Sequence, residues 1–163
     1  MAVPGTAVMA RWKFRGLDQY VAKLEVLHGD ADEHIKRAIY EGAGVVADRI
    51  AAGLAGVQTA EDEYYRKGQI QPGPKPDEKA ALIASFGIAK MRKSGSAIQT
   101  KVGFGNARHG DVTVATLARR LESGTSFQRK QPVIRRAMSG ARSAAEQAIK
   151  KELEEQIKKS MGG

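Results

Sequence analysis

The chain has 163 residues, a formal net charge of +9 at pH 7 and no cysteine. Its length predicts one domain, residues 1–163, with enough chain to bury a hydrophobic core. The absence of cysteine excludes disulfides, thiolate catalysis and cysteine-ligated zinc. No run approaches the roughly 20 apolar residues of a membrane span, and MAVPGTAVMARW lacks the parts of a signal peptide, so we expect a soluble protein with no membrane contact.

The positive charge is concentrated in the middle of the chain. Residues 1–85 carry 11 basic and 12 acidic side chains, whereas residues 86–136 carry 11 basic and only 2 acidic ones. Residues 137–163 carry 5 basic and 4 acidic side chains. A partner attracted by charge would therefore meet the middle third.

The first half begins with a short extension, residues 1–7, and a strand. Residues 7–15 alternate between apolar and polar side chains, which places Trp12 and Phe14 on the core side of a half-buried strand. After Gly16, apolar residues at helical spacing predict a short helix that Asp18 caps, ending at residues 28–29.

A second helix is predicted from a capping box at Asp30 and Glu33 and an apolar stripe that reaches Leu54. Its three glycines each cost about 1 kcal/mol relative to alanine in a helix interior. We therefore expect tight packing against a neighbouring helix around them: Gly42, Gly44 and Gly53.

Residues 56–76 form a long loop with prolines at 72, 74 and 76 that disfavour helix and central strand. Loops of about 20 residues are rare within compact domains, so this one is either flexible or ordered by a partner. Tyr64 and Tyr65 are candidates to anchor it to another subunit; a solvated loop is an equally good interpretation.

Asp77 begins a brief helix, and two short runs around Arg92-Lys93-Ser94-Gly95-Ser96 predict a β-hairpin that extends to Phe104. The following GFGNARHG lacks the spacing of a phosphate-binding loop and predicts a turn that ends the hairpin. Residues 111–121 fit a helix slightly better than a strand.

A break at Glu122-Ser123-Gly124-Thr125 then precedes a long helix. Gly124 supplies freedom for positive φ, and the Thr125 hydroxyl can bond the local backbone. Pro132 suits the first turn of a helix that continues to Lys159, with an alanine-rich middle suited to close packing.

The sequence offers no catalytic constellation, cofactor motif or metal site. The histidines at 28, 34 and 109 lack metal-like spacing, and no serine or threonine has the context of an activated nucleophile. We therefore expect a protein that is not an enzyme, with no cofactor.

The basic middle contains four pairs of cations that could contact DNA phosphates or an acidic partner, or form a solvated basic face: Arg92 and Lys93, Arg119 and Arg120, Arg129 and Lys130, Arg135 and Arg136. No base-reading motif accompanies them, so DNA contact would be non-specific.

Three segments of the chain resemble the tail-component family of long-tailed bacteriophages, the HK-type neck proteins. FRGLDQYVAKLEVL is similar to the family's first strand, turn and helix, and HIKRAIYEGAGVVADRIAAGL to its second helix. LESGTSFQRKQPVIRRAM resembles its acidic turn, polar spacer, proline and terminal helix, with matches at Glu122, Gly124, Thr125, Pro132 and Ala137. The chain departs from the family pattern at residues 76–79 and 118–120.

The resemblance implies a virion structural protein of the neck, a tail-completion or head–tail joining component, assembled in the host cytoplasm. It further implies a homo-oligomeric ring, expected to be a hexamer, with other neck and tail proteins such as head-closure, tail-terminator or tail-tube proteins as partners. Non-specific contact with packaged DNA fits the same reading. The alternative from charge alone is a small basic protein that binds nucleic acid without sequence preference.

The predicted fold class is α+β. The N-terminal strand and the central hairpin would form a small antiparallel sheet. An N-terminal helix pair and the long terminal helix would pack on it.

Overall fold

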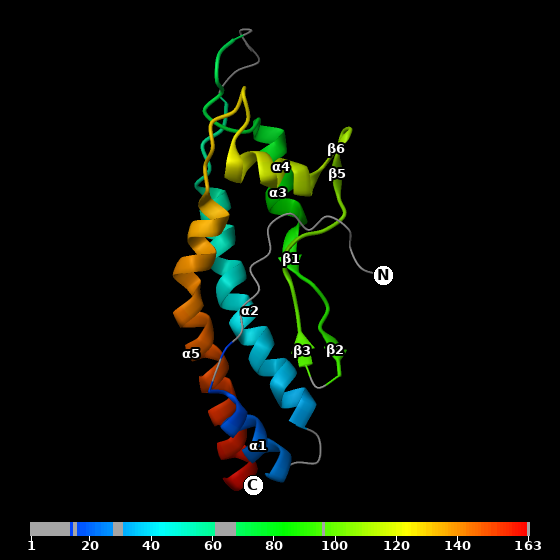
Figure 1. Ribbon diagram of the computed structural model, residues 1–163, viewed down its shortest axis with the longest axis vertical. Helices are drawn as coiled ribbons and strands as arrows, with labels where there is room; N and C mark the ends of the chain where they lie inside the picture. Colours follow the sequence, from blue (N-terminus) through cyan, green and yellow to red (C-terminus); the bar gives the residue numbers. More distant parts are fainter. Residues whose placement is uncertain (1–13, 15, 28–30, 61–67, 96, 163) are drawn as a thin grey trace.

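The computed structural model describes residues 14, 16–27, 31–60, 68–95 and 97–162, and it is elongated (Figure 1). Helices α2 and α5 run side by side along its length, with α1 at the end that holds the C-terminus and α3 and α4 at the other. The helices are α1 (Asp18–Leu27), α2 (Ala31–Ala55), α3 (Pro76–Ser85), α4 (Val114–Ser123) and α5 (Val133–Gly162). The strands are β1 (Phe86–Ile88), β2 (Arg92–Ser94), β3 (Ala97–Gln99), β4 (Val102–Phe104), β5 (Arg108–His109) and β6 (Val112–Thr113). Helices with small antiparallel strand pairs confirm the predicted α+β class.

The antiparallel helices α2 and α5 form the central unit of the fold. A Cβ placed at Gly42 would lie 2.6 Å from Cγ1 of Ile149, and one at Gly53 would lie 3.5 Å from Cβ of Val133. Between them, Arg49 Nη1 donates to the carbonyl of Gly140 at 3.2 Å. The predicted close helix packing is confirmed at Gly42 and Gly53. It is wrong at Gly44, where a Cβ would meet nothing within 4 Å.

Two clusters of buried side chains fill the molecule. The cluster at the upper end of Figure 1 joins α2, α3, β4, α4 and the first half of α5, with Leu82, Phe104 and Leu121 among its members. The cluster at the lower end joins α1, the start of α2 and the end of α5, with Leu24 and Leu153 at its centre. Small residues of α5 such as Ala141 and Ala145 are buried in the upper cluster, which lets α2 and α5 approach closely.

The central hairpin consists of two ladders with different registers. In the first, Phe86 pairs with Phe104 and Ile88 with Val102. In the second, Arg92 pairs with Gln99. Three residues, 89–91, separate the two ladders on the first strand, but only two, 100 and 101, separate them on the second. One extra residue therefore lies on the first strand between the ladders, which is a β-bulge and bends the hairpin. Ile98, Thr100 and Val102 are half-buried and Phe104 is buried, whereas the alternating residues Gln99 and Lys101 are exposed.

The segment after the hairpin contains more structure than the sequence predicts. The glycine-rich residues that were expected only to end the hairpin lead into a second, two-residue hairpin, β5–β6, with Gly110 at φ +58° in its turn. Thr113 then caps α4 because its hydroxyl accepts the backbone N–H of Thr116 at 3.2 Å. Residues 111–121 are thus strand first and helix afterwards.

The two described flanks of the long loop are hydrogen-bonded within the chain. The N–H of Ala60 donates to the carbonyl of Pro74 at 2.9 Å, and Gln71 forms a parallel bridge with Gln128. Pro76 was expected to disfavour helix, but it is the first residue of α3. The first turn of a helix needs no N–H donor at that position, so proline is tolerated there. Flexibility or partner-induced order of the loop stays a prediction for its middle, residues 61–67, which lie outside the described residues.

The predicted N-terminal strand, and with it the proposed sheet partner of the hairpin, lies outside the described residues except for Phe14. So does the capping residue Asp30. Phe14 packs against both core clusters. Within the described part of the chain, no helix has the length and apolar character to cross a membrane.

Candidate functional site

The connection between α4 and α5 is held by a buried carboxylate. Glu122, only 4% exposed, lies in the last turn of α4. Its Oε1 accepts the backbone N–H of Ile134 at 2.7 Å, and its Oε2 accepts that of Arg135 at 3.3 Å. Both donors belong to the first turn of α5, where N–H groups lack helical partners and the helix dipole favours negative charge. Glu122 is therefore an interhelical cap.

The turn after Glu122 has the local chemistry that the sequence predicts. Gly124 adopts φ +72°, and its N–H donates to the carbonyl of Arg120 at 2.8 Å. The Thr125 hydroxyl accepts the N–H of Gln128 at 3.0 Å. Pro132 immediately precedes α5, and its carbonyl accepts the N–H of Arg136 at 3.3 Å. Ala137 packs against the upper core cluster.

Gln131 joins three segments, a role that the sequence did not suggest. Its Oε1 accepts the N–H of Gln58 at 2.9 Å, and its Nε2 donates to the carbonyls of Gln58 and Pro72 at 2.8 and 3.1 Å. Its own N–H donates to the carbonyl of Leu121 at 2.7 Å. The two flanks of the long loop are therefore held by the side chain of Gln131, and the end of α4 by its backbone N–H.

Lys79 of α3 fastens the end of α2 in the same region. Its ammonium group donates to the carbonyls of Ala55 and Val57 at 2.8 and 2.9 Å. A cation at the last carbonyls of a helix satisfies them and complements the helix dipole. Lys79 thus joins α3 to the end of α2.

Six of the eight predicted contact cations lie in this connection, which we call the cationic end. They are Arg119, Arg120, Arg129, Lys130, Arg135 and Arg136, of which all but the half-buried Arg120 are exposed. The only acidic residue between positions 112 and 136 is Glu122, and it is buried. Among the described residues, no carboxylate forms an ion pair with any of the six.

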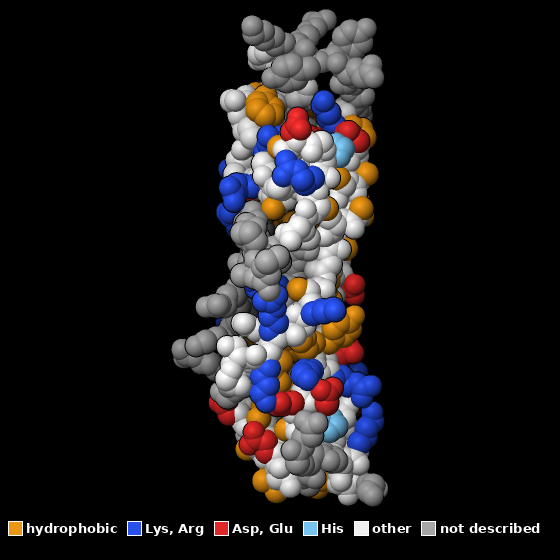
Figure 2. All heavy atoms as spheres, turned by 90° about the vertical axis from the view of Figure 1, so that its right-hand side faces the viewer, with side chains coloured by type: hydrophobic (Ala, Val, Ile, Leu, Met, Phe, Trp, Pro, Cys, Tyr) orange, Lys and Arg blue, Asp and Glu red, His pale blue; other side chains and the backbone are white. Residues whose placement is uncertain are grey.

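The other two cations, Arg92 and Lys93, lie elsewhere. They belong to β2, close to the tip of the hairpin, and Lys93 forms an ion pair with Asp32 in the first turn of α2. Figure 1 places this tip near the opposite end of α2 from the cationic end. The eight cations therefore do not form one continuous surface. Figure 2 shows Lys and Arg along the face it presents, with Asp and Glu among them near both ends.

The remaining candidates give no catalytic arrangement. Tyr64, Tyr65 and His28 lie outside the described residues. His109 Nε2 lies 3.1 Å from Oδ2 of Asp77 at the surface. Over the described ranges, no three histidine or acidic side chains are grouped in a way that could hold a metal ion.

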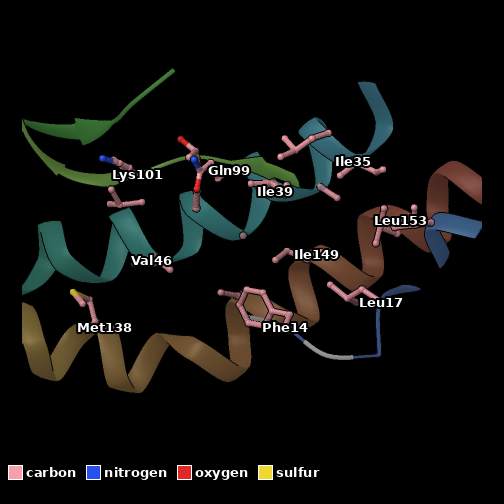
Figure 3. A pocket seen from close by; sticks show the side chains of 18 of the residues that line it. Phe14, Leu17, Ile35, Ile39, Val46, Gln99, Lys101, Met138, Ile149 and Leu153 are labelled. Atoms are coloured by element: carbon pink, nitrogen blue, oxygen red, sulfur yellow. The ribbon is translucent and has the colours of Figure 1, made fainter. Parts of the chain in front are cut away.

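An apolar groove of about 370 Å³ runs between the hairpin and the α2–α5 pair (Figure 3). Phe14 lies in it between the two helices, with Met138 toward one end and Leu17 and Leu153 toward the other. Gln99 and Lys101 of the hairpin lie along its rim. The groove has few polar groups, which fits packing better than recognition of a polar ligand.

Comparison with protein families, curated proteins and solved structures finds no match to this chain. The functional interpretation therefore depends on the residues and their geometry, together with the resemblance of the α4–α5 segment.

Proposed function

We propose that this chain is a structural, non-enzymatic subunit of a phage neck that forms a ring, expected to be six-fold, and joins head to tail. It would be a virion protein that assembles in the host cytoplasm and contacts neighbouring neck and tail proteins. The observation that carries the proposal is the α4–α5 connection. The positions that resemble the family's turn motif act there as one structural unit: Glu122, Gly124, Thr125 and Pro132 join two helices across a tight turn.

The geometry of the molecule is compatible with a ring subunit. A subunit that passes contacts between layers of an assembly needs a stiff body, and the α2–α5 pair provides one. It also needs different surfaces at different heights. The cationic end and the hairpin tip lie toward different ends of α2 and carry different side chains.

Non-specific nucleic-acid binding is the second candidate, and the cationic end favours it. Six cations without a described acidic partner could contact phosphates and release counterions. Such binding is sequence-independent and falls steeply with salt. In a neck, the same surface could approach packaged DNA.

The first experiment is native mass spectrometry across a range of protein concentrations, with negative-stain imaging of any oligomer. A closed ring, alone or after addition of purified heads or tails, supports the neck proposal and gives its symmetry. A chain that stays monomeric and binds neither heads nor tails contradicts it. If the monomer shifts duplex DNA at moderate salt, the second candidate is favoured.

Charge reversal tests the role of the cationic end. We expect R119E, R120E, R135E and R136E together to abolish head–tail joining while circular dichroism remains unchanged. The matched control reverses four exposed cations elsewhere on α5, R142E, K151E, K158E and K159E, and should leave joining intact. Equal loss in both variants would show that only total charge matters.

A further inference from the structure

Two exposed apolar side chains lie together at the cationic end. Gln71 and Gln128 form a parallel bridge in which the N–H of Gln71 donates to the carbonyl of Phe127 at 2.7 Å. Residues paired in a parallel bridge point to the same side, and their neighbours in each strand point to the other. Gln128 is 6% exposed, so it faces inward. Ile70 and Phe127 each precede one residue of the bridged pair and are 60% and 40% exposed, so both present apolar surface to solvent beside the bridge.

Two arginines lie close to this apolar surface. The guanidinium carbon of Arg120 lies 6.0 Å from the centre of the Phe127 ring. Arg129 is exposed two residues after Phe127, and its N–H donates to the carbonyl of Gln71 at 2.8 Å. The nearest carboxylate in the sequence, Glu122, is buried against the first turn of α5.

We infer that Ile70 and Phe127, with Arg120 and Arg129 beside them, are a docking site for an acidic protein surface that offers an apolar recess. The inference deepens the proposed function, on which it rests, by naming the surface that meets a neighbouring protein. Aromatic and arginine side chains at the centre of a patch are typical anchors of protein interfaces, and the positive surroundings require a negative partner for complementarity.

Two other occupants fit less well. A DNA backbone would satisfy the arginines, but it would leave Ile70 and Phe127 in contact with water. A symmetric contact between two copies at this site would bring the exposed cations of both cationic ends together, where like charges repel. The binding test described next distinguishes DNA and a second copy from an acidic protein partner.

The test compares three fluorescent probes by anisotropy: polyglutamate, a random copolymer of glutamate and tyrosine, and duplex DNA of about 30 base pairs. We expect the copolymer to bind tightest. The double variant I70S and F127S should weaken copolymer binding about ten-fold and leave binding of polyglutamate and DNA unchanged. The matched control V26S and M161S changes two exposed apolar residues at the other end of the molecule and should have no effect.

Three results would overturn the inference: tightest binding to DNA, equal loss of all three probes in the double variant, or self-association abolished by that variant. Circular dichroism of each variant shows whether it is folded, and both replaced side chains are exposed. Failure here is separable from failure of the neck proposal. Wild-type protein that forms rings on heads or tails but does not prefer the copolymer refutes only the docking site.

Discussion

The carboxylate of Glu122 accepts the backbone N–H of Ile134 at 2.7 Å, across the turn between α4 and α5. A buried side chain in the last turn of α4 thus caps the first turn of α5. Because the first N–H groups of a helix lack intrahelical partners, this contact satisfies two of them.

Replacement of Glu122 should destabilise the fold. E122A removes both acceptors of the first turn of α5 and leaves a buried N–H without a partner, so we expect a loss of about 3 kcal/mol in the free energy of unfolding. E122Q keeps one acceptor oxygen, so its free energy of unfolding should fall by less. Urea denaturation measures both, with the exposed E41A as control. Unfolding midpoints of E122A and E41A that coincide would refute the cap.

The two neighbouring glycines of α2 should respond oppositely to alanine. At Gly42 the added Cβ would lie 2.6 Å from Ile149 Cγ1 and 3.2 Å from the carbonyl oxygen of Ala145, so G42A should destabilise by about 1–3 kcal/mol. At Gly44 the Cβ meets nothing within 4 Å, so G44A should stabilise by about 0.5–1 kcal/mol. Thermal unfolding of both variants provides the comparison, and a shift of the same sign in both would contradict the packing.

Loss of the Gln131 side chain should loosen the long loop without unfolding the helices. Q131A removes three hydrogen bonds to Gln58 and Pro72. Hydrogen exchange should then rise about ten-fold or more at the amide of Gln58, while amides in the middle of α2 remain protected. The exposed Q99A is the control. Unchanged protection at Gln58 would mean that the loop is held by other contacts.

The ion pair at the hairpin tip should contribute little. Lys93 and Asp32 are 49% and 37% exposed as side chains, and exposed pairs are worth about 0–1 kcal/mol because water screens them. A double-mutant cycle with K93A and D32A should give a coupling energy below about 1 kcal/mol that falls further in high salt. A larger coupling that salt does not change would show that the tip is more shielded than its exposure indicates.

The sequence predicts best the elements whose signals are local. The helices α2 and α5 show apolar periodicity over many turns, and Gly124 and Thr125 carry the turn chemistry themselves. The strands β5 and β6 were missed because two residues are too few to establish a period. Pro76 was misassigned because the same residue that ends a helix interior is favoured at its first turn.

The features of the candidate site that the sequence could not predict depend on long-range pairing. Ile70 and Phe127 become neighbours only through the bridge between Gln71 and Gln128, residues far apart in the chain. Glu122 and Gln131 find their partners after the helices have packed. The sequence did single out Glu122, as an acid in the helix break within a basic segment and as a position of the family's turn motif, but not the N–H groups that it caps.

The α2–α5 pair also sets the distance between the hairpin tip and the cationic end. Asp32 binds the hairpin tip and Gly53 contacts Val133 beside the cationic end, and the intervening stretch of α2 spans about 32 Å at 1.5 Å per residue. The contacts of Glu122, Gln131 and Lys79 hold the upper end of the pair in place, so the span of α2 fixes the separation between the two contact surfaces. A neighbour that engages both the tip and the cationic end must therefore match that span, and lengthening only one helix would break the match while leaving each contact surface intact.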